Sequence, residues 1–144
     1  MKYTNPPEYK LINSYITSVK KGKISPLVGY DYYKQLHNKI DSSIVGLTTT
    51  NGIKISDQSD HFIERVIGVI KDPDTGLKRP GIELEDIKEA LINGKALKPK
   101  ISYDKQGNIL YDKNGKPKLS QKFITYKCEV AVNPETGVLI MCNP

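Results

Sequence analysis

A histidine and an arginine placed four residues apart, His61 and Arg65, are the side chains of this sequence best suited to chemistry. The apolar residues around them recur at helical intervals, and residues four apart on a helix emerge side by side on one face. An imidazole transfers protons near neutral pH, and a guanidinium binds a phosphate through two parallel hydrogen bonds. The pair therefore suits cleavage of a phosphodiester. The alternative is a structural histidine, with Arg65 in an ion pair to a nearby carboxylate: Glu64, Asp60 or Glu85.

Helical periodicity governs the first part of the chain. Helices are predicted to open at Pro6-Pro7-Glu8, to span residues 30–40, to start near Ser56 or Ser59, and to span residues 83–92. The side chains expected to point inward from the last three are Tyr33, Leu36 and Ile40, then Phe62, Ile63, Val66, Ile67 and Ile70, then Leu84, Ile87, Ala90 and Leu91.

From Lys95 onward the apolar residues alternate with polar ones, which is typical of β-strands. Four antiparallel strands are expected, at residues 101–103, 109–111, 123–132 and 138–141. This order predicts an α+β fold with N-terminal helices packed on a C-terminal antiparallel four-stranded β-meander. We assign residues 1–52 to an N-terminal helical extension or linker, and residues 53–144 to the domain that carries His61.

Two turn segments of the strand region nearly repeat. Residues 103–108 read Tyr-Asp-Lys-Gln-Gly-Asn, and residues 111–116 read Tyr-Asp-Lys-Asn-Gly-Lys. Each predicts a hairpin turn in which glycine supplies a positive φ. Two copies of so short a segment indicate turn chemistry and not a repeat architecture.

The positive charge is concentrated in the strand region. Nine lysines stand between Lys95 and Lys127 against Asp104 and Asp112, so this segment carries +7 in a chain whose net charge is +6. Such asymmetry predicts a polyanionic partner, of which nucleic acid is the usual one. The alternative is a lysine-rich, solvated sheet edge that discourages aggregation.

The strand predicted at residues 123–132 divides its side chains between two faces. Alternation directs Tyr126 and Cys128 toward the helices, and Thr125 and Lys127 toward the opposite face. A functional sheet surface is therefore expected around Thr125 and Lys127. The alternative is an ordinary solvated strand face.

The two cysteines, Cys128 and Cys142, flank a hairpin whose turn is predicted at residues 133–137. We expect two reduced, half-buried thiols, although one strand register would place them face to face. Neither the cysteines nor the histidines have zinc-ligand spacing, which predicts no metal site.

No apolar run approaches the roughly 20 residues of a membrane span. The first residues show no signal-peptide pattern, and export as the tail of a longer secreted protein stays open.

Three segments in a fixed order resemble a known nuclease superfamily. They are Ser-Asp-His-Phe-Ile-Glu-Arg at residues 59–65, the helical segment at residues 81–91, and the Asn-Pro-x-Thr-Gly hairpin within residues 132–140. Their order and spacing resemble the superfamily that unites barnase, EndoU, the tRNA-cleaving colicins and RelE (the BECR fold). The likeness is greatest to versions found in phage-derived and polymorphic-toxin proteins of bacteria, and it covers residues 53–144.

The resemblance implies a metal-independent ribonuclease without a cofactor, often a toxin, whose active site lies on the sheet and the adjoining helix. His61 and Arg65 match the helical histidine and arginine of the family, and Arg79 lies near where some members carry a further basic residue. The last strand departs from the pattern. Many relatives have serine or threonine there, where this chain has Met141-Cys142-Asn143, and we assign no catalytic role to Cys142.

Cleavage of RNA by its own 2′-hydroxyl needs a proton acceptor, a proton donor and cations for the charge of the phosphorane. We expect His61 to act as base or acid, Arg65 as phosphate clamp, and Lys127 or Arg79 as the second cation. Thr125 is expected to donate a hydrogen bond to a nonbridging oxygen. Two further residues are assigned to substrate binding, Tyr126 and Lys122; Tyr126 offers a stacking face, although its position in the alternation favours the core.

Two other classes of function fit the same residues: a basic module that binds nucleic acid without cutting it, and a phage-associated adaptor domain. The expected partners of a toxin are RNA, tRNA above all, and an acidic immunity protein that covers the site. No membrane partner is expected. A toxin of this type would be a secreted or delivered effector acting in the cytoplasm of a target cell, and otherwise the protein would be cytoplasmic.

Overall fold

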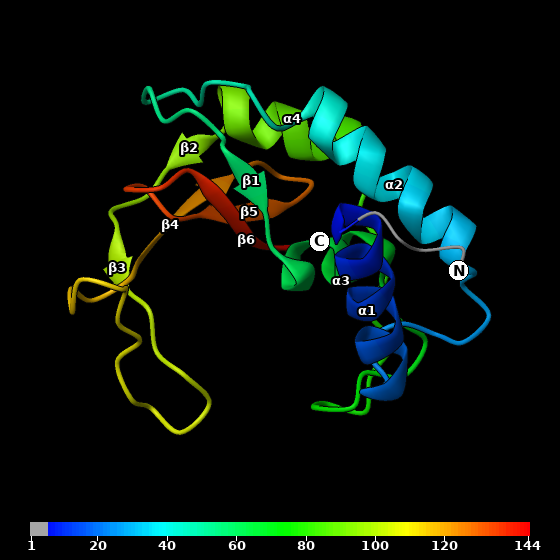
Figure 1. Ribbon diagram of the computed structural model, residues 1–144. Helices are drawn as coiled ribbons and strands as arrows, with labels where there is room; N and C mark the ends of the chain where they lie inside the picture. Colours follow the sequence, from blue (N-terminus) through cyan, green and yellow to red (C-terminus); the bar gives the residue numbers. More distant parts are fainter. Residues whose placement is uncertain (1–5) are drawn as a thin grey trace.

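The computed structural model describes residues 6–144, which form an α+β fold (Figure 1). The α+β class predicted from the sequence is confirmed. The helices are α1 (Pro6–Lys20), α2 (Tyr30–Ser43), α3 (Asp60–Ile67) and α4 (Leu84–Asn93). The strands are β1 (Asp57–Gln58), β2 (Lys95–Ala96), β3 (Lys100–Ile101), β4 (Leu119–Ile124), β5 (Glu129–Val132) and β6 (Val138–Asn143). Within residues 6–144 no helix is long and apolar enough to cross a membrane.

The sheet is mixed and has the strand order β1-β6-β5-β4-β2, with β3 paired to β4 beside this path. Strands β4, β5 and β6 are antiparallel neighbours, whereas the short β1 runs parallel to β6 at the edge. Because β1 precedes α3 in the chain, the helices and strands are not segregated as the prediction of four consecutive meander strands required.

The prediction of one strand at residues 123–132 is wrong. The chain turns back at residues 125–128, so this segment is divided between β4 and β5. Thr125 makes this turn: its backbone N–H donates to the Cys128 carbonyl at 3.0 Å, and its hydroxyl accepts from the Lys127 N–H at 3.2 Å. A threonine hydroxyl offers such local bonds to the backbone and so competes with continued strand pairing.

One face of the sheet packs against α4 and is continuous with the core. Phe123, Val130 and Cys142 stand opposite one another in register on this face, and each is buried. The other buried apolar residues of the core cluster are Ile24, Tyr33, Leu36, Ile40, Ile44, Ile55, Phe62, Ile63, Val66, Ile87, Ala90, Leu91, Cys128, Val132 and Leu139. Residues on both sides of position 52 therefore share one core, and most of the inward faces predicted for the helices are confirmed.

The opposite face of the sheet carries polar side chains. Glu129 stands directly across from Asn143, and Lys122 across from Ala131, which lies two residues beyond Glu129 on the same strand. Partners in antiparallel register share a face, so Lys122, Glu129 and Asn143 point to the side away from Val130 and Cys142. Figure 1 shows α4 along one side of the sheet, with the segment between β3 and β4 projecting from the other side.

The Asn-Pro-Glu-Thr-Gly turn joins β5 to β6 and is closed by its own asparagine, whose side-chain oxygen accepts from the backbone N–H groups of Glu135 and Thr136. Gly137 has a φ of +81° and lies so close to the preceding segment that an added Cβ would stand 2.1 Å from the Lys54 carbonyl oxygen. Its own carbonyl accepts from the Ser56 N–H at 3.0 Å. This contact fixes the segment that leads into β1 and α3.

Replacing Gly137 by alanine is expected to destabilise the fold by about 3 kcal/mol or more, because backbone strain adds to a clash with backbone atoms. The matched control is Gly115→Ala, which has a φ of +77° and open space where a Cβ would stand. It should cost only about 1 kcal/mol. Urea unfolding of both variants measures the difference in the free energy of unfolding. Equal losses of stability would show that the backbone at Lys54 moves away from the added Cβ at little cost.

Candidate functional site

Helix α3 is tied to β6 at its first turn. The Ser59 hydroxyl caps the helix by accepting from the Phe62 N–H at 3.2 Å, and it donates to the Ile140 carbonyl at 2.9 Å. One residue thereby sets both the start of the helix and its position against the strand. His61 and Arg65 both lie on α3, as the sequence predicted, and both are half-buried beside its apolar face.

The imidazole of His61 is open to solvent and held from behind by a carboxylate. Its side chain is 41% exposed, and Nδ1 lies 3.3 Å from Glu64 Oε1. The second carboxylate oxygen of Glu64 accepts from the Ser18 hydroxyl of α1 at 2.6 Å, and Ser18 is buried. With Nδ1 engaged, the other ring nitrogen, Nε2, makes no hydrogen bond with residues 6–144.

Glu64 is ionised under ordinary conditions. Burial by itself favours the neutral carboxyl, but hydrogen bonds from His61 and Ser18, together with the charge of Lys23, lower the pKa of Glu64 below its ordinary value of 4.5. A carboxylate anchored in this way holds the imidazole in one orientation. The N-terminal segment thus contributes to the candidate site through α1.

The guanidinium of Arg65 reaches the polar face of the sheet. Its Nη1 donates to the Asn143 side-chain oxygen at 2.7 Å, and the Asn143 amide donates to Glu129 Oε1 at 3.1 Å. Lys122 approaches the same carboxylate oxygen at 3.5 Å. Among residues 6–144, Arg65 forms no ion pair with Glu64, Asp60 or Glu85, and its buried Nε has no hydrogen-bond partner.

Arg79 supplies a second guanidinium, whose charge interacts with that of Arg65. It forms an ion pair with the buried carboxylate of Asp72, which fixes it on the loop between α3 and α4. Burial lowers the pKa of Arg79, the positive charge of Arg65 lowers it further, and Glu64 opposes the shift. Two guanidinium groups that interact in this way repel each other, so an anion placed against them gains from both.

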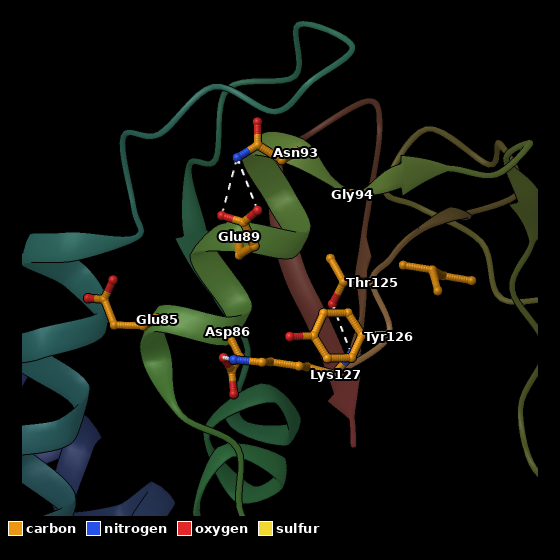
Figure 2. Close-up of a pocket in the computed structure, with 9 residues that line it drawn as sticks. Glu85, Asp86, Glu89, Asn93, Gly94, Thr125, Tyr126 and Lys127 are labelled. Carbon is orange, nitrogen blue, oxygen red and sulfur yellow. Dashed lines mark hydrogen bonds and ion pairs between the residues drawn. The ribbon is translucent and has the colours of Figure 1, made fainter.

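Thr125, Tyr126 and Lys127 lie elsewhere, in the turn between β4 and β5 against α4 (Figure 2). They line one wall of a groove of about 560 Å³, and Lys127 Nζ stands 3.4 Å from Asp86 Oδ1 across it. The expectation that Tyr126 points to the core is wrong, since this residue is 93% exposed. The remaining groove residues are Glu85, Glu89, Asn93, Gly94 and Ile124.

The structure thus brings together part of the predicted set. His61 contacts Glu64, and the charge of Arg79 interacts with those of Glu64 and Arg65. Lys122 is connected to Arg65 through Glu129 and Asn143. Thr125, Tyr126 and Lys127 line the groove beside α4 instead, where Lys127 pairs with Asp86.

Sequence reasoning missed the polar partners Ser18, Glu129 and Asn143. A signal for Asn143 was present, because a core-facing Cys142 places the next residue on the opposite face. Ser18 had no such signal, since its partner is 46 residues away in the chain.

The cysteines are free and buried. In the observed register Cys142 stands opposite Val130, whereas Cys128 precedes β5 and lies two residues before Val130 in the chain. Burial raises the pKa of the Cys142 thiol to about 12, and burial likewise raises that of Cys128. Both stay protonated near neutral pH, which makes neither a nucleophile.

In the described part of the chain no group of three or more His, Cys, Asp or Glu side chains is arranged to hold a metal ion.

Comparison with known proteins found no matching family model, no matching curated protein and no matching solved structure. The likeness to the barnase–EndoU–colicin–RelE superfamily therefore stays a prediction. Function has to be argued from the geometry and charge of the site itself.

Replacing Ser18 by alanine is expected to destabilise the fold at pH 7 by about 1.5–3 kcal/mol, because it removes a donor to a buried, charged carboxylate. The pKa of Glu64 is lowered in the folded state. The Glu64 charge therefore stabilises the fold above about pH 4.5, and this stabilisation is lost as the pH falls through the folded-state pKa. The difference between wild type and Ser18→Ala should therefore narrow in acid.

Urea unfolding across this pH range tests the prediction, with Ser14→Ala, one turn earlier on α1, as the control. A stability difference that does not change with pH would mean that the hydroxyl does not act through the Glu64 charge.

Proposed function

We propose that the protein is a metal-independent endoribonuclease, in which the 2′-hydroxyl of RNA attacks the adjacent phosphodiester. The observation that carries this proposal is the grouping of two interacting guanidinium groups, Arg65 and Arg79, with a solvent-open imidazole held by Glu64. Phosphate is the ligand best matched to paired guanidinium groups. A neighbouring imidazole suits proton transfer at that phosphate.

In this mechanism the Nε2 of His61 transfers the proton to or from a reacting oxygen, while Glu64 holds Nδ1. A carboxylate in this position fixes the ring and stabilises the imidazolium that forms during the reaction. Arg65 and Arg79 bind the nonbridging oxygens and stabilise the extra charge of the phosphorane. Anchoring by Asn143 and Asp72 keeps both guanidinium groups in place before the substrate arrives.

RNA is the proposed substrate class, with tRNA as the first candidate, and the positive net charge of +6 favours such a polyanion. We propose a toxin-type effector that acts in the cytoplasm of a target cell. An acidic immunity protein is the matching inhibitor, because it would complement the charge of the site.

Replacing His61 by alanine is expected to lower RNA cleavage by about 100-fold or more, the usual contribution of a general acid or base. The control is His37→Ala, because His37 is the other histidine of the chain and also has a carboxylate partner, Asp41, at 3.5 Å. The measurement is cleavage of total tRNA in the presence of EDTA, with detection of fragments that end in a 2′,3′-cyclic phosphate.

Wild type and His37→Ala should produce the same fragments, and His61→Ala should produce almost none although it still unfolds cooperatively in a thermal melt. Cleavage by His61→Ala at the wild-type rate would refute the proposed chemistry. An absence of cleavage by the wild type on every RNA tested would refute the enzyme itself.

Replacing Arg65 by lysine tests the phosphate clamp. Lysine keeps the charge but loses the planar fork that binds Asn143 and a phosphate together, so kcat/KM is expected to fall by about tenfold or more. Lys127→Ala should change kcat/KM by less than about twofold, because the Lys127 ammonium faces Asp86 in the α4 groove. Equal losses of kcat/KM in the two variants would contradict this site and indicate that Lys127 and the α4 groove also take part in the reaction.

A further inference from the structure

Residues 98–118, here called the arm, contain β3 and the projecting segment that joins β3 to β4 (Figure 1). It contains six lysines and two aspartates, which leaves a net charge of +4 out of +6 for the whole chain. Two tyrosines stand at the same position of its two successive turns. Tyr103 is 58% exposed and Tyr111 is 57% exposed. Large aromatic side chains displayed so openly among lysines are available to a partner.

The arm is ordered by backbone hydrogen bonds although it has few apolar residues. Ser102 donates to the Lys118 carbonyl, Lys118 to the Leu110 carbonyl, and Leu110 to the Ser102 carbonyl, which closes a ring of three bonds at 2.8–3.0 Å. Asp104 and Asp112 each close a turn by accepting from two backbone N–H groups. The tyrosine side chains take no part in these bonds, so the arm presents them on a preformed backbone.

The tip of the arm reaches the loop that carries Arg79. Lys105 Nζ stands 3.0 Å from Asp74, and the Asp74 N–H donates to Asp72, the ion-pair partner of Arg79. At its other end the arm pairs with β4, where Lys100 stands opposite Ser120. Four residues further along β4, Ile124 stands opposite Glu129, which binds Asn143 of the site. Four strand residues span about 13 Å. The arm and the arginine cluster are therefore neighbours.

We propose that the arm is a second RNA-binding site, which stacks unpaired bases on Tyr103 and Tyr111 and pairs their phosphates with its lysines. This inference rests on the proposed ribonuclease function, and it names single-stranded RNA as the part of the substrate held outside the cleaved phosphate. Single-strand binders combine a positive surface with exposed aromatic rings, because every base has a face to stack. Duplex RNA offers no such face to the tyrosines, and its regular backbone would engage only the lysines.

The test is the binding of a labelled, fully 2′-O-methylated RNA of roughly 12 nucleotides, a length within the range of single-strand sites. This RNA lacks the nucleophilic hydroxyl and is not cut, so fluorescence anisotropy reports binding alone. The variants are Tyr103→Ala/Tyr111→Ala and Tyr103→Phe/Tyr111→Phe, in the full chain. The control is Tyr32→Ala, which removes a tyrosine of α2 that is 56% exposed.

The double alanine variant is expected to raise Kd by about tenfold or more, whereas the double phenylalanine variant and Tyr32→Ala should bind like the wild type. Binding should weaken as salt is added, because the lysines displace counterions from the phosphates. Equal affinity of the wild type and the double alanine variant, or no binding by the wild type, would overturn the proposal and leave a protein as the partner of the arm.

The two proposals can fail separately. Arm-dependent binding of methylated RNA without cleavage of ordinary RNA would refute the nuclease and leave the arm site standing. Cleavage that depends on His61, with binding that does not depend on Tyr103 and Tyr111, would refute the arm site and support the nuclease.

Discussion

The docking of α3 on β6 is the constraint on which the rest of the site depends. Ser59 fixes the first turn of the helix to the strand, and Arg65, two turns later, reaches Asn143 at the end of the same strand. A helix pinned at both ends cannot rotate about its own axis, so the direction of His61 is set as well. The Gly137 turn supports this docking from the other side, because it positions the segment that leads into β1 and α3.

Local patterns in the sequence were enough for the helices and for the roles of their faces. The start near Ser59 and the shared side of His61 and Arg65 are set within one helix, and both were predicted. The apolar stripe was predicted correctly for Phe62, Ile63 and Val66, but Ile70 lies beyond the end of α3 and is exposed. The alternation at residues 129–132 also gave the right faces, with Glu129 opposite to Val130. It failed before the turn. One continuous strand would place Phe123 on the face of Thr125 and Lys127, but Phe123 is buried opposite Val130, because the chain reverses at residues 125–128.

What the sequence did not disclose depends on contacts between distant segments. Ser18 of α1 bonds to Glu64, and Asn143 of β6 bonds to both Arg65 and Glu129. Neither the period of a helix nor that of a strand carries information about such partners. Lys127 illustrates the same limit, because its charge predicted a role on the sheet surface, whereas the fold sets it against Asp86.

Electrostatics divides the molecule into two sides. The groove beside α4 contains Glu85, Asp86 and Glu89, while the arginine cluster and the arm place positive charge around the other side of the sheet. This asymmetry favours approach of the proposed RNA substrate to the second side, before any specific contact forms. Asp72 and Asp74 lie between the cluster and the arm, where they hold Arg79 and Lys105.

The central claim is that His61 and Arg65 serve one bound phosphate, and proton NMR of the two histidine rings tests it directly. Titration with uridine 3′-monophosphate is expected to shift the His61 ring resonances in a saturable way and to leave those of His37 unchanged. The His61 shift should disappear in Arg65→Ala. Ring resonances of His61 that do not respond, or that respond equally with and without the guanidinium, would contradict the account.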